Sequence, residues 1–115
     1  MSLFSNLFGK PKFDSINQQQ AIDVVDEYKK TQILDVRTPE EYRQGGIKSS
    51  MNINVQDGAF EKKINTLDKE GVYLVYCKGG KRSKEACDKM VDLGFKTVFN
   101  LKGGLSRWRG EYKMR

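Results

Sequence analysis

Cys77 is the residue of this sequence best placed for chemistry, because it joins an apolar run to a glycine-rich basic loop. The run covers residues 72–76, and the loop reads Lys-Gly-Gly-Lys-Arg before Ser83. A thiolate is a far better nucleophile than a thiol, and backbone N–H groups, a helix N-terminus and nearby cations all stabilise it. The same N–H groups would bind an anionic substrate or intermediate.

We predict that Cys77 is largely a thiolate near neutral pH. Gly79 and Gly80 can adopt the positive φ angles that turn consecutive N–H groups toward one sulfur atom. Ser83 is expected to cap the helix that follows, which would place the helix N-terminus beside the thiol. The loop also carries three cations, Lys78, Lys81 and Arg82. The alternative is a cysteine that merely ends a buried strand.

The composition excludes several mechanisms. The chain has no histidine, so it can form neither a Cys-His pair nor a Ser-His-Asp triad. Its two cysteines, Cys77 and Cys87, are too few for a disulfide scaffold and do not form a Cys-x-x-Cys motif. We therefore expect no metal site and no cofactor, and we expect Cys87 to be a buried core thiol on the helix after the loop.

The positive charge of the chain is concentrated around Cys77. Residues 1–76 hold 10 Lys or Arg and 11 Asp or Glu, a net charge of −1, whereas residues 77–115 hold 11 and 4, a net charge of +7. Such a field would draw in small anions or nucleic acid. The chain lacks a basic strand with interleaved aromatic residues, so we predict a small anion and no nucleic acid. For the outlying lysines, a solvated basic surface is an equal alternative.

The length of 115 residues suits one domain. We predict a flexible extension at residues 1–12 and a folded domain at residues 13–115. No apolar run approaches the roughly 18 residues that span a membrane, and the first residues lack the features of a signal peptide. A reduced compartment suits a free reactive thiol, so the expected location is the cytoplasm.

Helical and strand-like patterns alternate along the chain. Asn17 and Gln20 form a capping-box pattern before a helix, and Thr38 and Pro39 begin a second, shorter one. The first helix is expected to present one apolar face, formed by Ala21, Ile22, Val25 and Tyr28. Strands are expected at 32–36, 51–55, 72–76 and 97–101, with further helices after residues 58, 82 and 104. This alternation predicts an α/β fold, a mostly parallel sheet with helices on both faces and Cys77 at the carboxyl end of its central strand.

The sequence resembles the single-domain rhodaneses, a sulfurtransferase family, in four segments. Residues 77–83 resemble the active-site loop of that family, and residues 35–42, Asp-Val-Arg-Thr-Pro-Glu-Glu-Tyr, resemble its first signature. Residues 46–53 and 100–108 are similar to two further signatures. Gly46 stands where the family commonly has histidine, and Asn54 stands where it commonly has proline. The match runs from about residue 14 to residue 110 in the family's order.

The resemblance implies a sulfur relay through Cys77. The thiolate would take a sulfane sulfur from a small anionic donor, thiosulfate or a persulfide, and pass it to cyanide, a cellular thiol or a protein thiol. The persulfide would be held by the loop, which comprises Lys78, Gly79, Gly80, Lys81, Arg82 and Ser83. In this comparison Lys81 and Arg82 would orient the donor, and Asp35 and Arg37 would form a supporting structural pair.

Two other classes of function remain open on the sequence. Cysteine phosphatases and arsenate reductases also place a thiolate before an arginine, but with the spacing Cys-x5-Arg. Here the spacing from Cys77 to Arg82 is Cys-x4-Arg, and the tighter loop suits one sulfur atom better than a phosphoryl group. The other class is a persulfide carrier or docking module without enzymatic activity, which could use Phe4, Phe8 and the basic surface.

Overall fold

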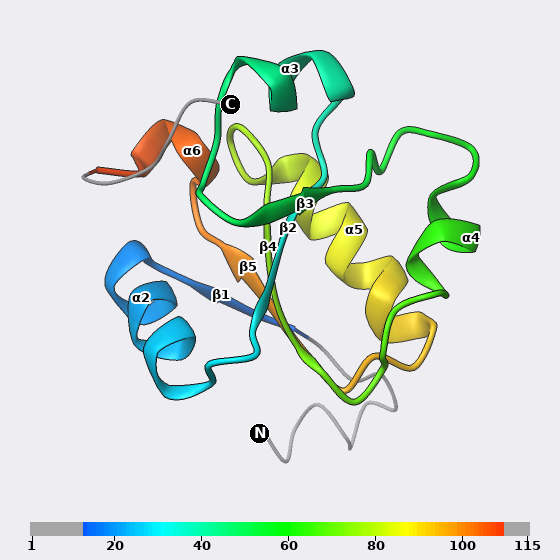
Figure 1. Ribbon diagram of the computed structural model, residues 1–115, viewed down its shortest axis with the longest axis horizontal. Helices are drawn as coiled ribbons and strands as arrows, with labels where there is room; N and C mark the ends of the chain where they lie inside the picture. The colour runs from blue at the N-terminus through cyan, green and yellow to red at the C-terminus, as the bar shows by residue number, and fades with distance from the viewer. Residues whose placement is uncertain (1–12, 110–115) are drawn as a thin grey trace.

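Strands and helices alternate throughout residues 13–109, the part of the chain that the computed structural model describes (Figure 1). The predicted N-terminal extension lies outside these residues. The five strands are β1 (Asp14–Ile16), β2 (Gln32–Asp35), β3 (Ser50–Asn52), β4 (Val72–Tyr76) and β5 (Thr97–Leu101). The helices are α2 (Gln18–Glu27), α3 (Pro39–Gln44), α4 (Phe60–Ile64), α5 (Lys81–Asp92) and α6 (Gly104–Arg107).

All five strands are parallel, in the order β1-β5-β4-β2-β3. The apolar strand β4 lies at the centre, as its sequence predicts, and all four of its residues from Tyr73 to Tyr76 are buried. The register pairs Tyr76 with Asp35 of β2 and Val75 with Asn100 of β5. The carboxyl ends of these three strands therefore meet at one edge of the sheet, directly before Cys77.

Two apolar cores cover the two faces of the sheet. Cys77 and Val75 face the core built with α4 and α5, where Phe60, Ile64 and Met90 are buried. The opposite core lies under α2 and α6 and includes the following buried residues: Ile16, Ala21, Ile33, Leu74, Tyr76 and Leu101. Helices thus cover both faces, which confirms the predicted α/β architecture.

Local capping explains where most helices begin and end. The capping box of Asn17 and Gln20 is present at the start of α2, and Thr38 caps α3 with Glu41 as its partner. Helix α5 ends at Asp92, and Gly94 follows its C-cap. The left-handed φ of 98° at Gly94 permits a Schellman turn in which the N–H of Phe95 donates to the carbonyl of Met90.

The structure corrects several local predictions. The strand predicted at 51–55 is β3, which runs from Ser50 to Asn52. The buried side of α2 runs through Ala21, whereas Ile22 and Tyr28 are 37% and 48% exposed. The short strand β1 was not predicted, because three residues carry too little periodicity to reveal a strand. Helix α5 begins at Lys81 rather than at Ser83.

The buried carboxylate of Asp35 organises the edge of the sheet on the β2 side. Its oxygens accept hydrogen bonds from the guanidinium of Arg37 at 2.6 and 2.9 Å and from the hydroxyl of Tyr76 at 2.8 Å. Arg37 also donates to the carbonyl of Gly45, and Tyr76 accepts from the N–H of Ile47. These bonds offset the cost of burying the two charges and fix the chain that leaves β2.

None of the helices within residues 13–109 is long and apolar enough to cross a bilayer. The same residues contain no cluster of three or more acidic, cysteine or histidine side chains that could hold a metal ion.

Candidate active site

The sulfur of Cys77 lies inside the loop that follows β4, and the residue is only 1% exposed. Its Sγ atom accepts hydrogen bonds from the N–H groups of Gly80 at 3.0 Å and Ser83 at 3.3 Å, and it lies 3.4 Å from the hydroxyl of Ser83. Two residues of the predicted loop, Gly80 and Ser83, therefore contact this one sulfur atom. The arrangement can hold a negative charge on sulfur without a cation in direct contact.

Gly80, not Ser83, is the N-cap of α5. It has a left-handed φ of 106°, and its own N–H points back to the sulfur. Ser83 is then the third residue of the helix, and its N–H is one of the donors that have no partner within an α-helix. Cys77 supplies that partner, so the sulfur itself takes the place of a capping side chain at the positive end of α5.

The hydroxyl of Ser83 belongs to a buried polar chain that the sequence did not reveal. Its Oγ lies 2.5 Å from Oδ1 of Asn100 and 3.0 Å from the carbonyl oxygen of Gly80. Asn100 is fully buried, and its amide donates to Ser15 in β1 at 3.1 Å. A polar residue inside the apolar run of β5 was the signal that could have identified this position.

Helix α6 hydrogen-bonds to the backbone carbonyls at the start of the Cys77 loop. The N–H of Leu105 donates to the carbonyl of Cys77 at 3.0 Å, and the N–H of Ser106 donates to the carbonyl of Lys78 at 2.9 Å. This approach requires a glycine at position 104, because a side chain there would meet the carbonyls of Cys77 and Lys78, the latter at 2.6 Å, and Gly104 has a left-handed φ of 57°. The loop carbonyls thus face α6 while the loop N–H groups face the sulfur.

The three loop cations have different surroundings. The guanidinium of Arg82 forms a two-pronged ion pair with the carboxylate of Glu41 at 2.7 and 3.0 Å, which ties the loop to α3. Lys78 and Lys81 are exposed and form no ion pair within the described residues. The partnership of Glu41 with Arg82 was not predicted, because the residues are 41 positions apart.

Hydrogen bonds lower the pKa of the Cys77 thiol. Burial alone would raise it, but the hydroxyl and N–H of Ser83 and the N–H groups of Gly80 and Gly79 favour the thiolate more strongly. The sequence pointed to the cations as well, yet the main causes of the shift are these uncharged donors. By contrast, burial raises the pKa of Cys87, which lies in the core and is free of any disulfide.

Asp35 and Arg37, the two predicted supporting residues, lie side by side at the end of β2. Tyr76, the last residue of β4, lies between this pair and Cys77. Its hydroxyl donates to Asp35, and Cys77 is the next residue along the chain. Their contacts position the strand that carries the thiol and do not reach the sulfur.

The chain is similar to several known proteins. The rhodanese-like domain family matches residues 17–111. The Bacillus subtilis protein YtwF is 40% identical over 81 residues, which cover 70% of this chain and 76% of YtwF. The thiosulfate sulfurtransferase GlpE of Coxiella burnetii is 30% identical over 80 residues, which cover 70% of this chain and 73% of GlpE. A rhodanese-like domain protein of Staphylococcus aureus has a similar crystal structure, with a TM-score of 0.77, 28% identity, and coverage of 90% of this chain and 99% of that one.

The first prediction concerns the hydroxyl of Ser83. Replacing Ser83 with alanine removes the hydroxyl that lies 3.4 Å from the sulfur and helps to lower its pKa, so the pKa of Cys77 should rise and alkylation by iodoacetamide below that pKa should slow several-fold. The rate is measured against pH. Ser106→Ala is the matched control, because that residue contacts the loop through its backbone N–H. An unchanged midpoint in Ser83→Ala would contradict the role assigned to the hydroxyl.

The second prediction concerns the ion pair between Glu41 and Arg82. The hydrogen bond from Arg82 lowers the pKa of Glu41 from 4.5 to about 2. The folded chain therefore binds this proton less readily than the unfolded chain, and the resulting stability is present above about pH 5 and lost as the pH falls toward 2. We expect Glu41→Gln to lower the free energy of unfolding by about 1–3 kcal/mol at neutral pH and by progressively less in acid.

Urea unfolding across this pH range measures the difference between wild type and Glu41→Gln. The adjacent variant Glu40→Gln is the control, since the side chain of Glu40 is 72% exposed and its contact with Arg43 is long, at 3.7 Å. A deficit in Glu41→Gln that stayed constant from neutral pH to acid would contradict the assignment.

Proposed function

Because this chain belongs to the rhodanese-like domain family, we propose that it is a sulfurtransferase that carries a sulfane sulfur on Cys77 as a persulfide. The observation that supports this most directly is the pair of N–H groups, of Gly80 and Ser83, that donate to a buried sulfur atom. A persulfide places its negative charge where such donors can bind it. The proposed donor is thiosulfate, and the proposed acceptor is a thiol.

The first step would be attack of the Cys77 thiolate on the outer sulfur of thiosulfate. A new S–S bond forms at Cys77, the S–S bond of thiosulfate breaks, and sulfite leaves with the bonding electron pair. In the second step an acceptor thiolate attacks the outer sulfur of the persulfide, and Cys77 leaves as a thiolate. The two steps need no metal, general base or external oxidant.

The surroundings of Cys77 favour a small anionic donor. The residue is 1% exposed, so a donor has to present a single accessible sulfur atom. Lys78 and Lys81 are exposed, form no ion pair within residues 13–109, and would attract the anion. Arg82 instead fixes the loop through Glu41. Occupation of Arg82 by Glu41 also speaks against phosphatase chemistry, which would use that guanidinium to hold a phosphate.

Intact-mass spectrometry after incubation with thiosulfate tests the proposal. Wild-type protein should gain about 32 Da, one sulfur atom, and release an equivalent of sulfite. Cys77→Ser should gain nothing, and Cys87→Ser should gain the same mass as wild type. Absence of the adduct with thiosulfate and with an organic persulfide would refute the sulfurtransferase proposal. An adduct from the organic persulfide alone would replace thiosulfate with a persulfide donor and favour a sulfur carrier.

A further inference from the structure

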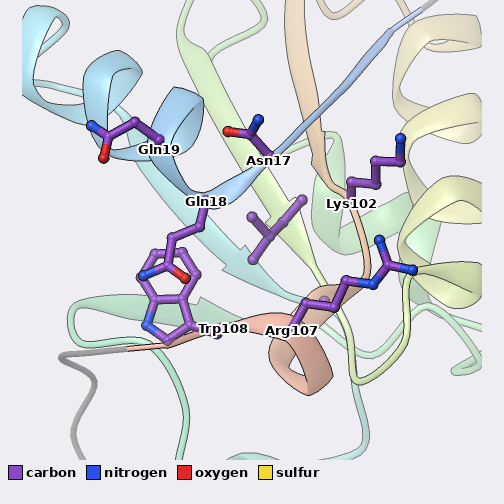
Figure 2. Close-up of a pocket in the computed structure, with 8 residues that line it drawn as sticks. Asn17, Gln18, Gln19, Lys102, Arg107 and Trp108 are labelled. Atoms are coloured by element: carbon purple, nitrogen blue, oxygen red, sulfur yellow. The ribbon is translucent and has the colours of Figure 1, made fainter.

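A pocket of about 320 Å³ opens at the carboxyl edge of the sheet, and the turn from Lys102 to Gly104 lies between it and the Cys77 loop (Figure 2). It lies where α2 begins and where β5 passes into α6. Its lining includes Asn17, Gln18, Leu101, Lys102, Arg107 and Trp108. Figure 2 shows Trp108 and Gln18 on one side of the pocket and the side chains of Lys102 and Arg107 on the other.

Within residues 13–109, the positive charge of the pocket has no acidic partner. Lys102 and Arg107 are exposed, and neither forms an ion pair with another residue in the range 13–109. Among those residues no acidic side chain lines the pocket. The start of α2, a helix of 10 residues, adds the positive end of its dipole. A carboxylate is therefore the group that these surroundings favour.

The remaining surface of the pocket suits a short peptide. Trp108, which is half-buried, provides apolar contact area above the buried Leu101. The amide of Gln18 is already held, because it donates to the carbonyl of Arg109 and accepts from the N–H of Arg109 at 2.7 Å. The side chain of Gln18 is therefore already ordered before a ligand binds, which reduces the entropic cost of association.

The turn from Lys102 to Gly104 separates the pocket from the Cys77 loop. The side chain of Arg107 lies across Gly103, where an added Cβ would come within 2.7 Å of its Cγ. On the other side Gly103 lies against the loop, and its N atom would be 3.3 Å from a Cβ at Gly80. Gly80 and Gly103 have no side chains, so neither residue places one between the pocket and the thiol.

The strand order sets the span that a ligand must cover. The pocket lies over β5 and β1, and Cys77 follows β4, the neighbour of β5. Neighbouring strands are about 4.8 Å apart, so β4 and β1 are separated by about 10 Å across the sheet. Three extended residues cover about the same length.

We propose that this pocket is an acceptor subsite that binds the C-terminal carboxylate of a short peptide thiol. The inference rests on the proposed sulfur transfer for its purpose, but the binding step does not depend on it. Lys102 and Arg107 hold the carboxylate, Trp108 packs on the backbone, and a cysteine two residues before the C-terminus reaches the loop. Its thiolate attacks the outer sulfur of the Cys77 persulfide, Cys77 leaves as a thiolate, and the peptide departs as a persulfide.

The binding test uses Trp108 as its probe, because it is the only tryptophan in the chain. N-acetyl-Ala-Gly-Gly, which has no thiol, should change the fluorescence of both wild type and Cys77→Ser with the same Kd. Its C-terminal amide should bind about tenfold more weakly, since the charge-assisted bonds are lost. Equal Kd values for the acid and the amide, or no fluorescence change with either, would overturn the proposal.

Matched variants separate the pocket from the general charge of the protein. Lys102→Gln with Arg107→Gln should weaken binding of the acid about tenfold and leave the amide unaffected. Lys30→Gln with Lys62→Gln removes the same charge at exposed sites away from the pocket and should change neither Kd. Equal losses in the two double variants would refute a local site.

Transfer kinetics distinguish failure of the subsite from failure of the sulfur chemistry. On protein preloaded with sulfur, N-acetyl-Cys-Gly-Gly should accept faster than its amide in wild type, and this preference should vanish in the Lys102→Gln, Arg107→Gln variant. Cyanide should accept equally fast from both proteins. Acid and amide reacting equally with wild type would overturn the acceptor role. A failure to load sulfur at all would refute the proposed function, and the fluorescence result would still decide whether the pocket binds a carboxylate.

Discussion

The arrangement of the site depends on how the two carbonyls at the start of the loop are bound. The N–H groups of Leu105 and Ser106, in the first turn of α6, donate hydrogen bonds to the carbonyls of Cys77 and Lys78 respectively. Once these carbonyls face outward, the next N–H groups of the loop turn inward to the sulfur. The close approach requires the bare Cα of Gly104. The helix after β5 thus shapes the loop after β4.

This arrangement separates the stabilisation of charge from the attraction of ligands. Inside the loop, uncharged donors lower the pKa of Cys77 despite its burial. Outside it, Arg82 is neutralised by Glu41 and serves to tie the loop to α3, whereas Lys78 and Lys81 remain available to solvent and to anions. A buried nucleophile surrounded by dipoles would keep its ionisation largely independent of salt, while recruitment of an anionic substrate would weaken as salt screens the lysines.

The sequence revealed the features that are encoded locally. The apolar run of β4, the capping boxes of α2 and α3 and the glycine loop at Cys77 were all predicted, because each depends on neighbouring residues. The start of α5 was placed too late, since Ser83 looks like a cap while its hydroxyl is in fact bound to Asn100. That bond, the Arg82–Glu41 pair and the contact of α6 with the loop join distant segments, so they emerge only when the sheet is assembled.

The central claim is that the folded loop stabilises a thiolate at Cys77, and direct titration of the wild-type protein tests it. Ultraviolet thiolate absorbance is recorded against pH, and the same titration of Cys77→Ser is subtracted. Burial raises the pKa of Cys87, so that thiol should not titrate in the same range. We predict a Cys77 transition clearly below the value of a free thiol, about 8.5. A transition at or above that value would contradict the account.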